Sequence, residues 1–424
     1  NKSYEEVFRP IQAPALFGNV MAHDFGAGNY YQTVSLVKGT YTIAMQWEDR
    51  FYSVGDETSG AQVDLDFYMV DQSGNKIFGF NRNNLNGDPL EIMPFVVQSS
   101  VEAKLIVIRR SGSQNVRFKY ILFRGDGSLA DNNQGISTII GQANAASAIA
   151  VGAALYLNTP AYGVNPPTVA SFSSRGGTKV DGVDRQKPNI VAPNGVNTTV
   201  NFGGVNIDGD PFPNFFGTSA AAPHAAAVAA LLTEAKKRYF NGESFNGQQM
   251  NDLMQNTAID MDAPGYDVNT GRGFIQADAA LRSFSNAYPQ IKSWQLQDSA
   301  FTPGTQPVTV QIKGQYFAHN ASVLFQYDTI PAVVTGDSLL IAQISPFAGN
   351  PPLAIYNPPM TTNGLDGGVS DSLYFFNSIV KNVKVTVNNA TKRFGEAIPA
   401  YSVDVTVDNQ PLSSTGLTLQ DLGL

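Results

Sequence analysis

Ser219 is the residue whose type and surroundings point most directly to chemistry. It lies in the stretch NFFGTSAAAPHAAAVAALL, residues 214–232, after Gly217 and Thr218 and before a run of residues with high helix propensity. A serine in the first turn of a helix can cap the free backbone N–H groups there. It can also act as a nucleophile, because the same N–H groups and the positive helix end stabilise an oxyanion. The local sequence leaves both alternatives open.

A nucleophilic serine needs a base, and the sequence offers three histidines. His224 follows Ser219 by five positions, a rotation of about 500° along a helix, so the two side chains leave different faces. We therefore expect His224 to be a packed structural residue. We expect His319, in YFAHNAS, to lie in an exposed loop. His23 and Asp24 form a conceivable pair, although adjacent side chains rarely orient each other.

The composition describes a folded, turn-rich chain and excludes several classes of protein. Of 424 residues, 43% are hydrophobic and 15% are charged, with 39 Gly and 24 Pro, which predicts about three largely β domains. The net charge of -8 leaves no broad basic surface, so we expect no nucleic-acid partner. The absence of Cys excludes disulfides and thiolate sites. The stretch 146–164 is interrupted by Asn158, Pro160 and Gly163, so we expect no membrane span.

The elements that would position Ser219 lie in a segment of mixed helix and strand pattern, residues 126–285. NAASAIAVGAALY predicts a short helix leading into a buried strand, and KPNIVAP predicts a short strand. A helix is expected from about 219 to 238, followed by helical spacing in NGQQMNDLMQNTAID and ADAALRSF.

The segments on either side of this α/β segment show only strand patterns. Residues 29–124 contain alternating stretches such as VRFKYILF between turn signals, which predict an antiparallel sandwich. Short strands such as PVTVQIKGQYF and PPLAIYN follow residue 286 and suggest an immunoglobulin-like sandwich. VKVTVNNATKRFGEAIPAYSVDVTVDN starts a further β module. The chain begins with NKSYEEVF and ends soon after a strand-like stretch, so we expect it to be a fragment.

Six stretches between residues 148 and 281 together carry a family resemblance. In order, they are AIAVGAALY, VASFSSRGGT, KPNIVAPNGV, FGTSAAAPHAAAVAALL, LMQNTAIDMD and NTGRGFIQADAAL. The fourth resembles Gly-Thr-Ser-x-Ala-x-Pro-His, the serine signature of the subtilisin-like serine proteases, the subtilase or S8 family. All six follow the order found in that family. The resemblance implies an α/β domain with a parallel sheet that hydrolyses peptide bonds without a cofactor for chemistry.

The resemblance also implies roles for individual residues. Ser219 matches the nucleophile, with its own backbone N–H in the oxyanion hole, and Thr218 matches a threonine that supports the oxyanion. Phe215 matches a position that lines the leaving-group side of the substrate cleft. His224 matches a second, non-catalytic histidine. Asn194 stands where many relatives have Gly, at a position that favours positive φ.

The sequence departs from the family pattern before the serine. It contains no Asp-Thr/Ser-Gly, His-Gly-Thr-His or Gly-Asn-Asp/Glu-Gly stretch, so the triad Asp and His and the oxyanion Asn are missing. Without the base, Ser219 has no proton acceptor. We therefore expect this chain alone to be an incompetent peptidase with an incomplete parallel sheet, and to require an upstream half of the domain that carries these residues.

The flanking β segments resemble modules found in bacterial proteins. HDFGAGNYYQTVSLVKGTYTIAMQWEDRF is similar to a jelly-roll-like domain inserted in some bacterial subtilases, the segment from 286 is similar to IPT/TIG domains, and the last segment is similar to MBG domains. We thus predict a multidomain chain: 1–22, the tail of the protease's first half; 23–125, a jelly-roll-like insertion; 126–285, the serine half; 286–380, immunoglobulin-like; 381–424, a partial MBG-like module.

Two functional hypotheses follow. The first is a secreted or surface-bound bacterial subtilase acting on protein or peptide substrates, and the second is a non-catalytic adhesion or binding protein built on a degenerate subtilase scaffold. No metal ligand is assigned. Asp64 and Asp66 in VDLDF, and NGDPLE at 86–91, leave structural calcium and a solvated acidic edge as alternatives, the second being the more common.

Overall fold

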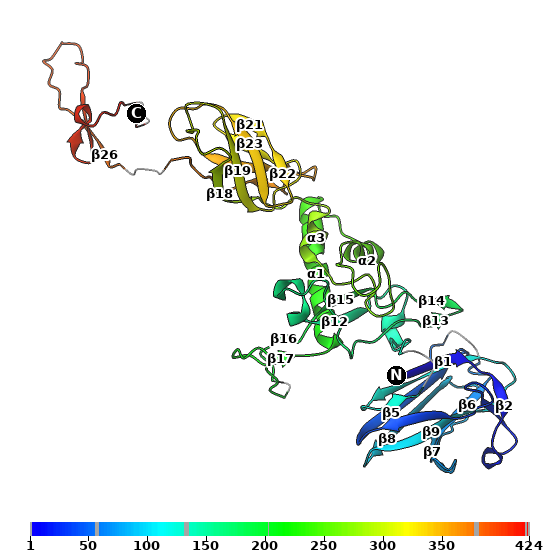
Figure 1. The fold of residues 1–424 in the computed structure, drawn as a ribbon. Helices are drawn as coiled ribbons and strands as arrows, with labels where there is room; N and C mark the ends of the chain where they lie inside the picture. Colours follow the sequence, from blue (N-terminus) through cyan, green and yellow to red (C-terminus); the bar gives the residue numbers. More distant parts are fainter. Residues whose placement is uncertain are drawn as a thin grey trace. The chain divides into compact units, whose positions relative to one another are not determined.

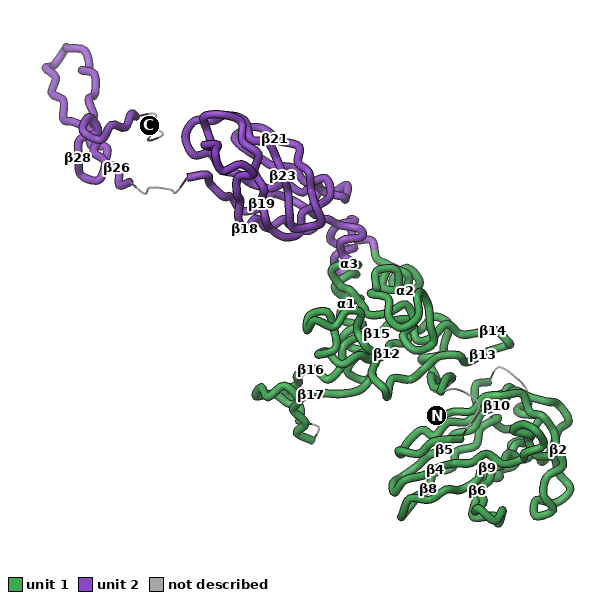
Figure 2. The backbone as a smooth tube through the Cα atoms, viewed as in Figure 1, with its two compact units in different colours: residues 1–233, 244–280 green, residues 234–243, 281–424 purple. Residues whose placement is uncertain are grey.

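The computed structural model describes residues 2–55, 59–130, 135–201, 203–376, 381–419 and 422. The chain divides into two compact units, which Figure 2 shows in different colours. The first comprises residues 1–233 and 244–280, and the second comprises residues 234–243 and 281–424.

The first unit opens with a module of two antiparallel sheets (Figure 1). One sheet has the order β1-β10-β5-β8; the other has the order β11-β4-β9-β3-β2, with β6 beside β9 and β7 beside β6. The strands are β1 (Ser3–Val7), β2 (Pro10–Gln12), β3 (Met21–His23), β4 (Gln32–Leu36), β5 (Gly39–Trp47), β6 (Asp64–Val70), β7 (Lys76–Phe80), β8 (Leu90–Val97), β9 (Val101–Ser111), β10 (Arg117–Arg124) and β11 (Ser128–Leu129), and the 3-10 helix η1 (Ala15–Phe17) lies between β2 and β3.

The two sheets share one hydrophobic core, because alternate residues of each strand point between them. On β5, Tyr41, Ile43, Met45 and Trp47 are buried while their neighbours are partly or fully exposed. This alternation is the pattern from which the sequence predicted an antiparallel module. The more specific jelly-roll assignment stays a prediction.

The start of this module differs from the expected boundary at residue 23. β1 pairs with β10 along its whole length, from Ser3 opposite Ile121 to Val7 opposite Arg117. β2 pairs with β3, which in turn pairs with β9. Residues 3–12 are therefore part of the two sheets. The assignment of residues 1–22 to the protease's first half missed this, because the partners of β1 lie more than a hundred positions away in the sequence.

The α/β segment of the first unit centres on two parallel strands, β12 (Val151–Leu155) and β15 (Ile190–Asn194), in register from Val151 opposite Ile190 to Leu155 opposite Asn194. Ala154 and Val191 pack with Met261 and Phe274 behind them. The remaining elements are η2 (Gly141–Asn144), η3 (Tyr156–Asn158), η4 (Pro160–Tyr162), β13 (Lys179–Val180), β14 (Val183–Asp184), β16 (Val196–Asn197), β17 (Asn214–Phe215), α1 (Thr218–Tyr239), α2 (Gly247–Asn256) and α3 (Ala277–Arg282).

Local signals explain where the helices begin and end. α1 starts directly after Gly217 and carries Lys236, Lys237 and Arg238 in its last turn, where cations favour the negative end of the helix dipole. α2 begins at a capping box in which the Asn246 side chain accepts the Gln249 N–H and the Gln249 side chain accepts the Asn246 N–H. The predicted helix over 219–238 thus corresponds to α1.

The second unit contains two four-stranded antiparallel sheets over one core and a separate three-stranded sheet. The orders are β18-β19-β23-β22, β21-β20-β24-β25 and β26-β27-β28. The strands are β18 (Gln290–Leu296), β19 (Val308–Gln315), β20 (Ser322–Phe325), β21 (Asp328–Pro331), β22 (Val333–Thr335), β23 (Leu339–Ile344), β24 (Leu353–Asn357), β25 (Gly368–Val369), β26 (Val383–Val387), β27 (Val403–Val407) and β28 (Gln410–Pro411), with η5 (Leu412–Ser414) at the end. The immunoglobulin-like and MBG-like assignments stay predictions. Among the described residues, no helix has the length and apolar character that crossing a membrane requires.

Candidate active site

Ser219 lies in the first turn of α1, immediately beyond a sharp bend in the backbone. Gly217 forms the bend with φ of 113°, a region that residues with a Cβ rarely adopt. Its carbonyl accepts the N–H of Ala220 at 2.9 Å and that of Ala221 at 3.3 Å, which closes the first turn. Ser219 is solvent-exposed and Thr218 is half-buried. The serine hydroxyl is therefore presented at the positive end of a 22-residue helix.

Asn194, at the end of β15, forms a hydrogen bond with this bend. Its Oδ1 accepts the Gly217 N–H at 3.5 Å, and its side chain is buried with 1% exposure. The Nδ2 atom of Asn194 has no hydrogen-bond partner within the described part of the chain. The sequence pattern indicates Asn194 only as a replacement for Gly and does not predict this contact.

The positive φ expected at Asn194 occurs one residue later. Gly195 has φ of 73°, and a Cβ there would approach Leu155 Cδ1 to 2.5 Å. Asn194 itself is the last strand residue of β15, with Leu155 of β12 opposite. The expectation for Asn194 was thus wrong by one position, since the strand continues through Asn194 and Gly195 makes the turn.

Phe215 is fixed close to the same strand end. β17 pairs with β16 so that Val196 lies opposite Phe215, and the Gly195 N–H donates to the Phe215 carbonyl at 2.9 Å. Phe215 is half-buried. The bend at Gly217 follows two residues later, so this short ladder holds the approach to Ser219 against the end of β15.

The histidines occupy three separate environments. His224 is half-buried and its Nδ1 lies 2.8 Å from the Ala220 carbonyl one turn earlier, which agrees with a structural role. His319 is exposed in a turn of the second unit. Neither residue forms a hydrogen bond with Ser219 among the described contacts.

His23 is buried inside the two-sheet module. Its Nδ1 accepts the Arg9 N–H at 3.1 Å, so the ring proton lies on Nε2 and donates to the Tyr4 hydroxyl at 2.7 Å. Burial, with the nearby Arg9 charge, lowers the pKa of His23 to about 3. Asp24 instead accepts the N–H groups of Gly26 and Gly28. The conceivable pair of His23 and Asp24 is therefore not formed.

The exposed face of α1 is apolar. Ala222, Pro223, Ala226, Ala227, Ala230 and Leu231 form a stripe at helical spacing that faces away from the rest of the described first unit, and Leu231 is 61% exposed. The opposite face buries Ala220, Ala221, Ala225 and Leu232. A helix that is apolar on both faces is typical of a buried helix rather than a surface helix.

The carboxylates that the sequence offered for calcium lie in the two-sheet module. Asp64 is 6% exposed and Asp66 is 1% exposed, so the expected solvated acidic edge was wrong for these two residues. Asp66 accepts from Arg110 Nε at 2.7 Å and from the Tyr68 hydroxyl at 2.9 Å, and Asp64 accepts the Asn84 N–H. Burial raises the pKa of the neighbouring Glu91 to about 8. No group of three or more His, Asp or Glu side chains in the described ranges is arranged to hold a metal ion.

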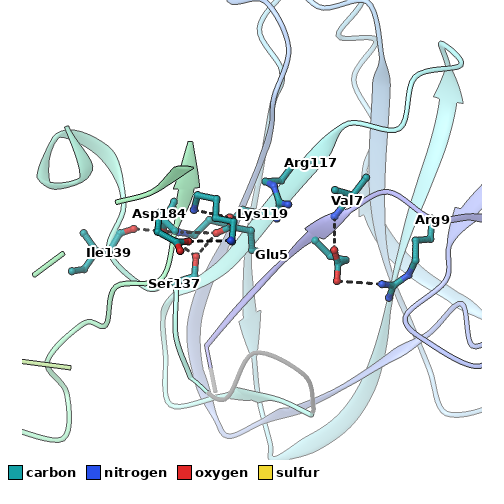
Figure 3. A network of polar contacts seen from close by, with 11 residues as sticks. Glu5, Val7, Arg9, Arg117, Lys119, Ser137, Ile139 and Asp184 are labelled. Carbon is teal, nitrogen blue, oxygen red and sulfur yellow. Dashed lines mark hydrogen bonds and ion pairs between the residues drawn. The ribbon is translucent and has the colours of Figure 1, made fainter. Parts of the chain in front are cut away.

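A cavity of about 680 Å³ lies in the first unit between β5, β10 and the segments around residues 140–145 and 178–181. Figure 3 shows the network at its wall, where the Lys119 ammonium approaches Glu5 and the Ile139 carbonyl. Burial lowers the pKa of Lys119 to about 8. Glu5 also accepts the Ser137 hydroxyl and lies 3.8 Å from Arg117. These charges compensate one another, so the network joins segments and offers no base to Ser219, which does not line the cavity.

Comparisons with known proteins agree on one family. A family model described as the subtilase family matches residues 84–305, more than half of the chain. Over 121 residues the chain is 33% identical to Fervidolysin of Fervidobacterium pennivorans, covering 27% of this chain and 16% of the relative. Over 154 residues it is 32% identical to alkaline elastase YaB of Bacillus sp. (strain YaB), covering 36% of this chain and 32% of the relative.

Solved structures give a weaker likeness. The Clostridium perfringens CspB protease matches with a TM-score of 0.40 and 17% identity, over 60% of this chain and 55% of that one. The match to Fervidolysin spans about a sixth of its length and the match to the elastase about a third.

Proposed function

Since the chain belongs to the subtilase family of serine peptidases, we propose that Ser219 is the nucleophile of an endopeptidase that hydrolyses peptide bonds in protein or peptide substrates. The observation that carries this proposal is the position of Ser219, exposed in the first turn of α1 directly after the positive-φ Gly217. A serine that only caps the helix does not need to be exposed directly after a positive-φ glycine.

In the proposed reaction, the Ser219 oxygen attacks the scissile carbonyl while a histidine removes its proton. The carbonyl oxygen becomes an oxyanion, which the Ser219 N–H binds and Thr218 supports, aided by the helix dipole. Phe215, fixed beside the end of β15, lines the leaving-group side of the cleft. The histidine then returns its proton to the leaving amine.

We propose that the Asp, the His and the oxyanion Asn are supplied by an upstream half of the domain, and that this chain alone is inactive. Two observations support this. The apolar stripe of α1 faces solvent although its composition is typical of a buried helix. β12 and β15 form a parallel pair, and parallel sheets are usually larger and covered by helices on both faces. The segment that supplies the histidine would then cover the apolar stripe of α1 and extend the parallel sheet formed by β12 and β15.

The remaining parts of the proposal follow from the family. The family reaction needs no cofactor for chemistry, and the protein is secreted or carried on the surface of a bacterium. The flanking β modules would then serve as spacers or binding modules.

Labelling by a fluorophosphonate probe tests the nucleophile. We expect rapid labelling of the protein that includes the upstream half, no labelling of its Ser219→Ala variant, and little labelling of the 424-residue chain alone. Equal labelling of the parent and of Ser219→Ala, or no labelling of a folded protein that contains the upstream half, would refute the assignment. The second outcome would favour the alternative of a non-catalytic binding protein on a subtilase scaffold.

A further inference from the structure

The cavity of about 680 Å³ in the first unit has walls that hydrogen bonds hold in place. On β10, the Lys119 ammonium donates to the Ile139 carbonyl at 3.2 Å and to the Thr178 hydroxyl at 2.8 Å. On β1, the Glu5 carboxylate accepts the Lys179 N–H at 3.2 Å. The strands of the two-sheet module and the segments opposite them therefore enclose the cavity as one connected structure.

The cations that line this cavity each have a carboxylate partner. Lys119 Nζ and Arg117 Nη1 both lie 3.8 Å from Glu5 oxygens. Lys179 Nζ lies 3.2 Å from Asp184. An anionic ligand would have to compete with these carboxylates for the same cations, so the cavity is poorly suited to an anion.

Two carboxylates that line the cavity have no such partner. The side chains of Glu48 and Asp181 form no hydrogen bond or ion pair among the described contacts. A third lining carboxylate differs from them, because Asp49 already accepts the N–H groups of Gln62 and Val63 at 2.8 Å. Glu48 and Asp181 are thus the acidic groups that remain for a ligand.

The electrostatic surroundings of Glu48 favour an additional cation. Desolvation raises the pKa of Glu48, and the negative charges of Asp181 and Glu5 raise it further. Arg117 acts in the opposite direction but does not reverse the shift. A further positive charge beside Glu48 would therefore stabilise its ionised form.

An amide oxygen and two apolar side chains complete the cavity. Asn144 lines it, and the buried Oδ1 atom of Asn144 has no hydrogen-bond partner in the part of the chain that the structure describes. Such an oxygen accepts a hydrogen bond from an N–H group. Phe51 and Ile140, the latter 37% exposed, add apolar surface. A guanidinium fits this combination, because it is a weakly hydrated planar cation with five N–H donors and it stacks on aromatic rings.

We propose that this cavity binds the guanidinium group of an arginine side chain from a protein partner, with Glu48 and Asp181 as its carboxylate partners. The Asn144 oxygen accepts a further N–H, and Phe51 packs against the plane of the cation. Ser219 does not line the cavity, so the arginine is bound rather than cleaved there. This inference is therefore independent of the proposed function.

An NMR titration of the 424-residue chain tests the site with two probes, Nα-acetyl-arginine amide and Nα-acetyl-citrulline amide, which has a similar shape without the charge. The cavity variant is Glu48→Gln/Asp181→Asn, since Asn tolerates the positive φ of 50° at position 181 as Asp does. The charge-matched control is Glu102→Gln/Asp126→Asn, two exposed carboxylates that do not line the cavity. We expect the affinity for the arginine probe to fall about tenfold in the cavity variant and to stay constant in the control.

The outcomes separate a specific site from general attraction to an acidic protein. Absence of saturable arginine binding by the parent chain overturns the inference, and so does citrulline binding of equal strength. Equal affinities of the parent and a folded cavity variant, or an equal loss in the control, overturn it as well. A salt titration of the parent gives a second measurement that needs no variant. The affinity for the arginine probe should fall as ionic strength rises, and an affinity independent of salt contradicts the ion pairs.

Discussion

At the scale of single residues, the bend at Gly217 depends on groups that lie far apart in the sequence. Gly217 adopts a backbone conformation that few other residues tolerate, and the buried amide of Asn194 accepts its N–H. Gly195 allows the chain to turn against Leu155 at the end of the strands. Together these residues set the direction in which Ser219 is presented, although none of them takes part in the proposed reaction.

The Asn194→Ala substitution tests this support. It removes the 3.5 Å hydrogen bond that the Gly217 N–H donates to the Asn194 side chain, which costs about 0.5–1.5 kcal/mol. We expect a lower melting temperature for the first unit and slower fluorophosphonate labelling of the protein that includes the upstream half. Asn256→Ala, which removes an exposed amide at the end of α2, is the control. Equal labelling rates in the two variants would show that Asn194 does not position the bend.

The buried His23 makes stability depend on pH. Its pKa is lowered from 6.5 to about 3 in the folded chain, so between these values the unfolded state binds a proton that the folded state does not. Stability contributed by the neutral ring is present above pH 6.5 and falls by about 1.4 kcal/mol per pH unit as the pH decreases towards 3. We expect urea unfolding between pH 4 and 7 to show a shallower pH slope for His23→Gln. Identical slopes would contradict the burial of a neutral His23.

At the scale of elements, the sequence predicted most of what is local. The helix expected over 219–238 is α1, and the strand expected in KPNIVAP is β15. The spacing of apolar residues and the helix or strand propensity predict such elements, because both are properties of the segment itself. β1 was missed because SYEEV shows no such spacing and gains its structure from β10. The turn residue was misplaced by one position because Asn194 and Gly195 both tolerate positive φ.

The apolar stripe of α1 gives a prediction at this scale. In the 424-residue chain, Ala226→Glu and Leu231→Glu place charges in solvent, so the melting temperature should change little. In the protein that includes the upstream half, the same charges would be buried without partners, and we expect a large loss of stability and of labelling. Val183→Glu, at an exposed position of β14, is the control. Full labelling of the Leu231→Glu variant would show that nothing covers the stripe.

At the scale of the whole molecule, the chain combines a subtilase-family region with several antiparallel sheets of β-strands. The types of segment and their order could be predicted from composition and pattern. The buried carboxylates Asp64 and Asp66 could not, because spacing places them on one strand face but does not tell which neighbours cover that face. The contact between Asn194 and Gly217 was equally hidden, since it joins positions 23 residues apart through the fold alone.

The central claim is that Ser219 is a real nucleophile whose partners lie on another segment, and complementation of peptide hydrolysis tests it most directly. The 424-residue chain is assayed with a fluorogenic peptide before and after addition of a separate polypeptide that carries the upstream half. We predict no hydrolysis by the chain alone, hydrolysis on mixing, and none on mixing with Ser219→Ala. Hydrolysis by the chain alone, or hydrolysis that survives Ser219→Ala, would contradict the claim.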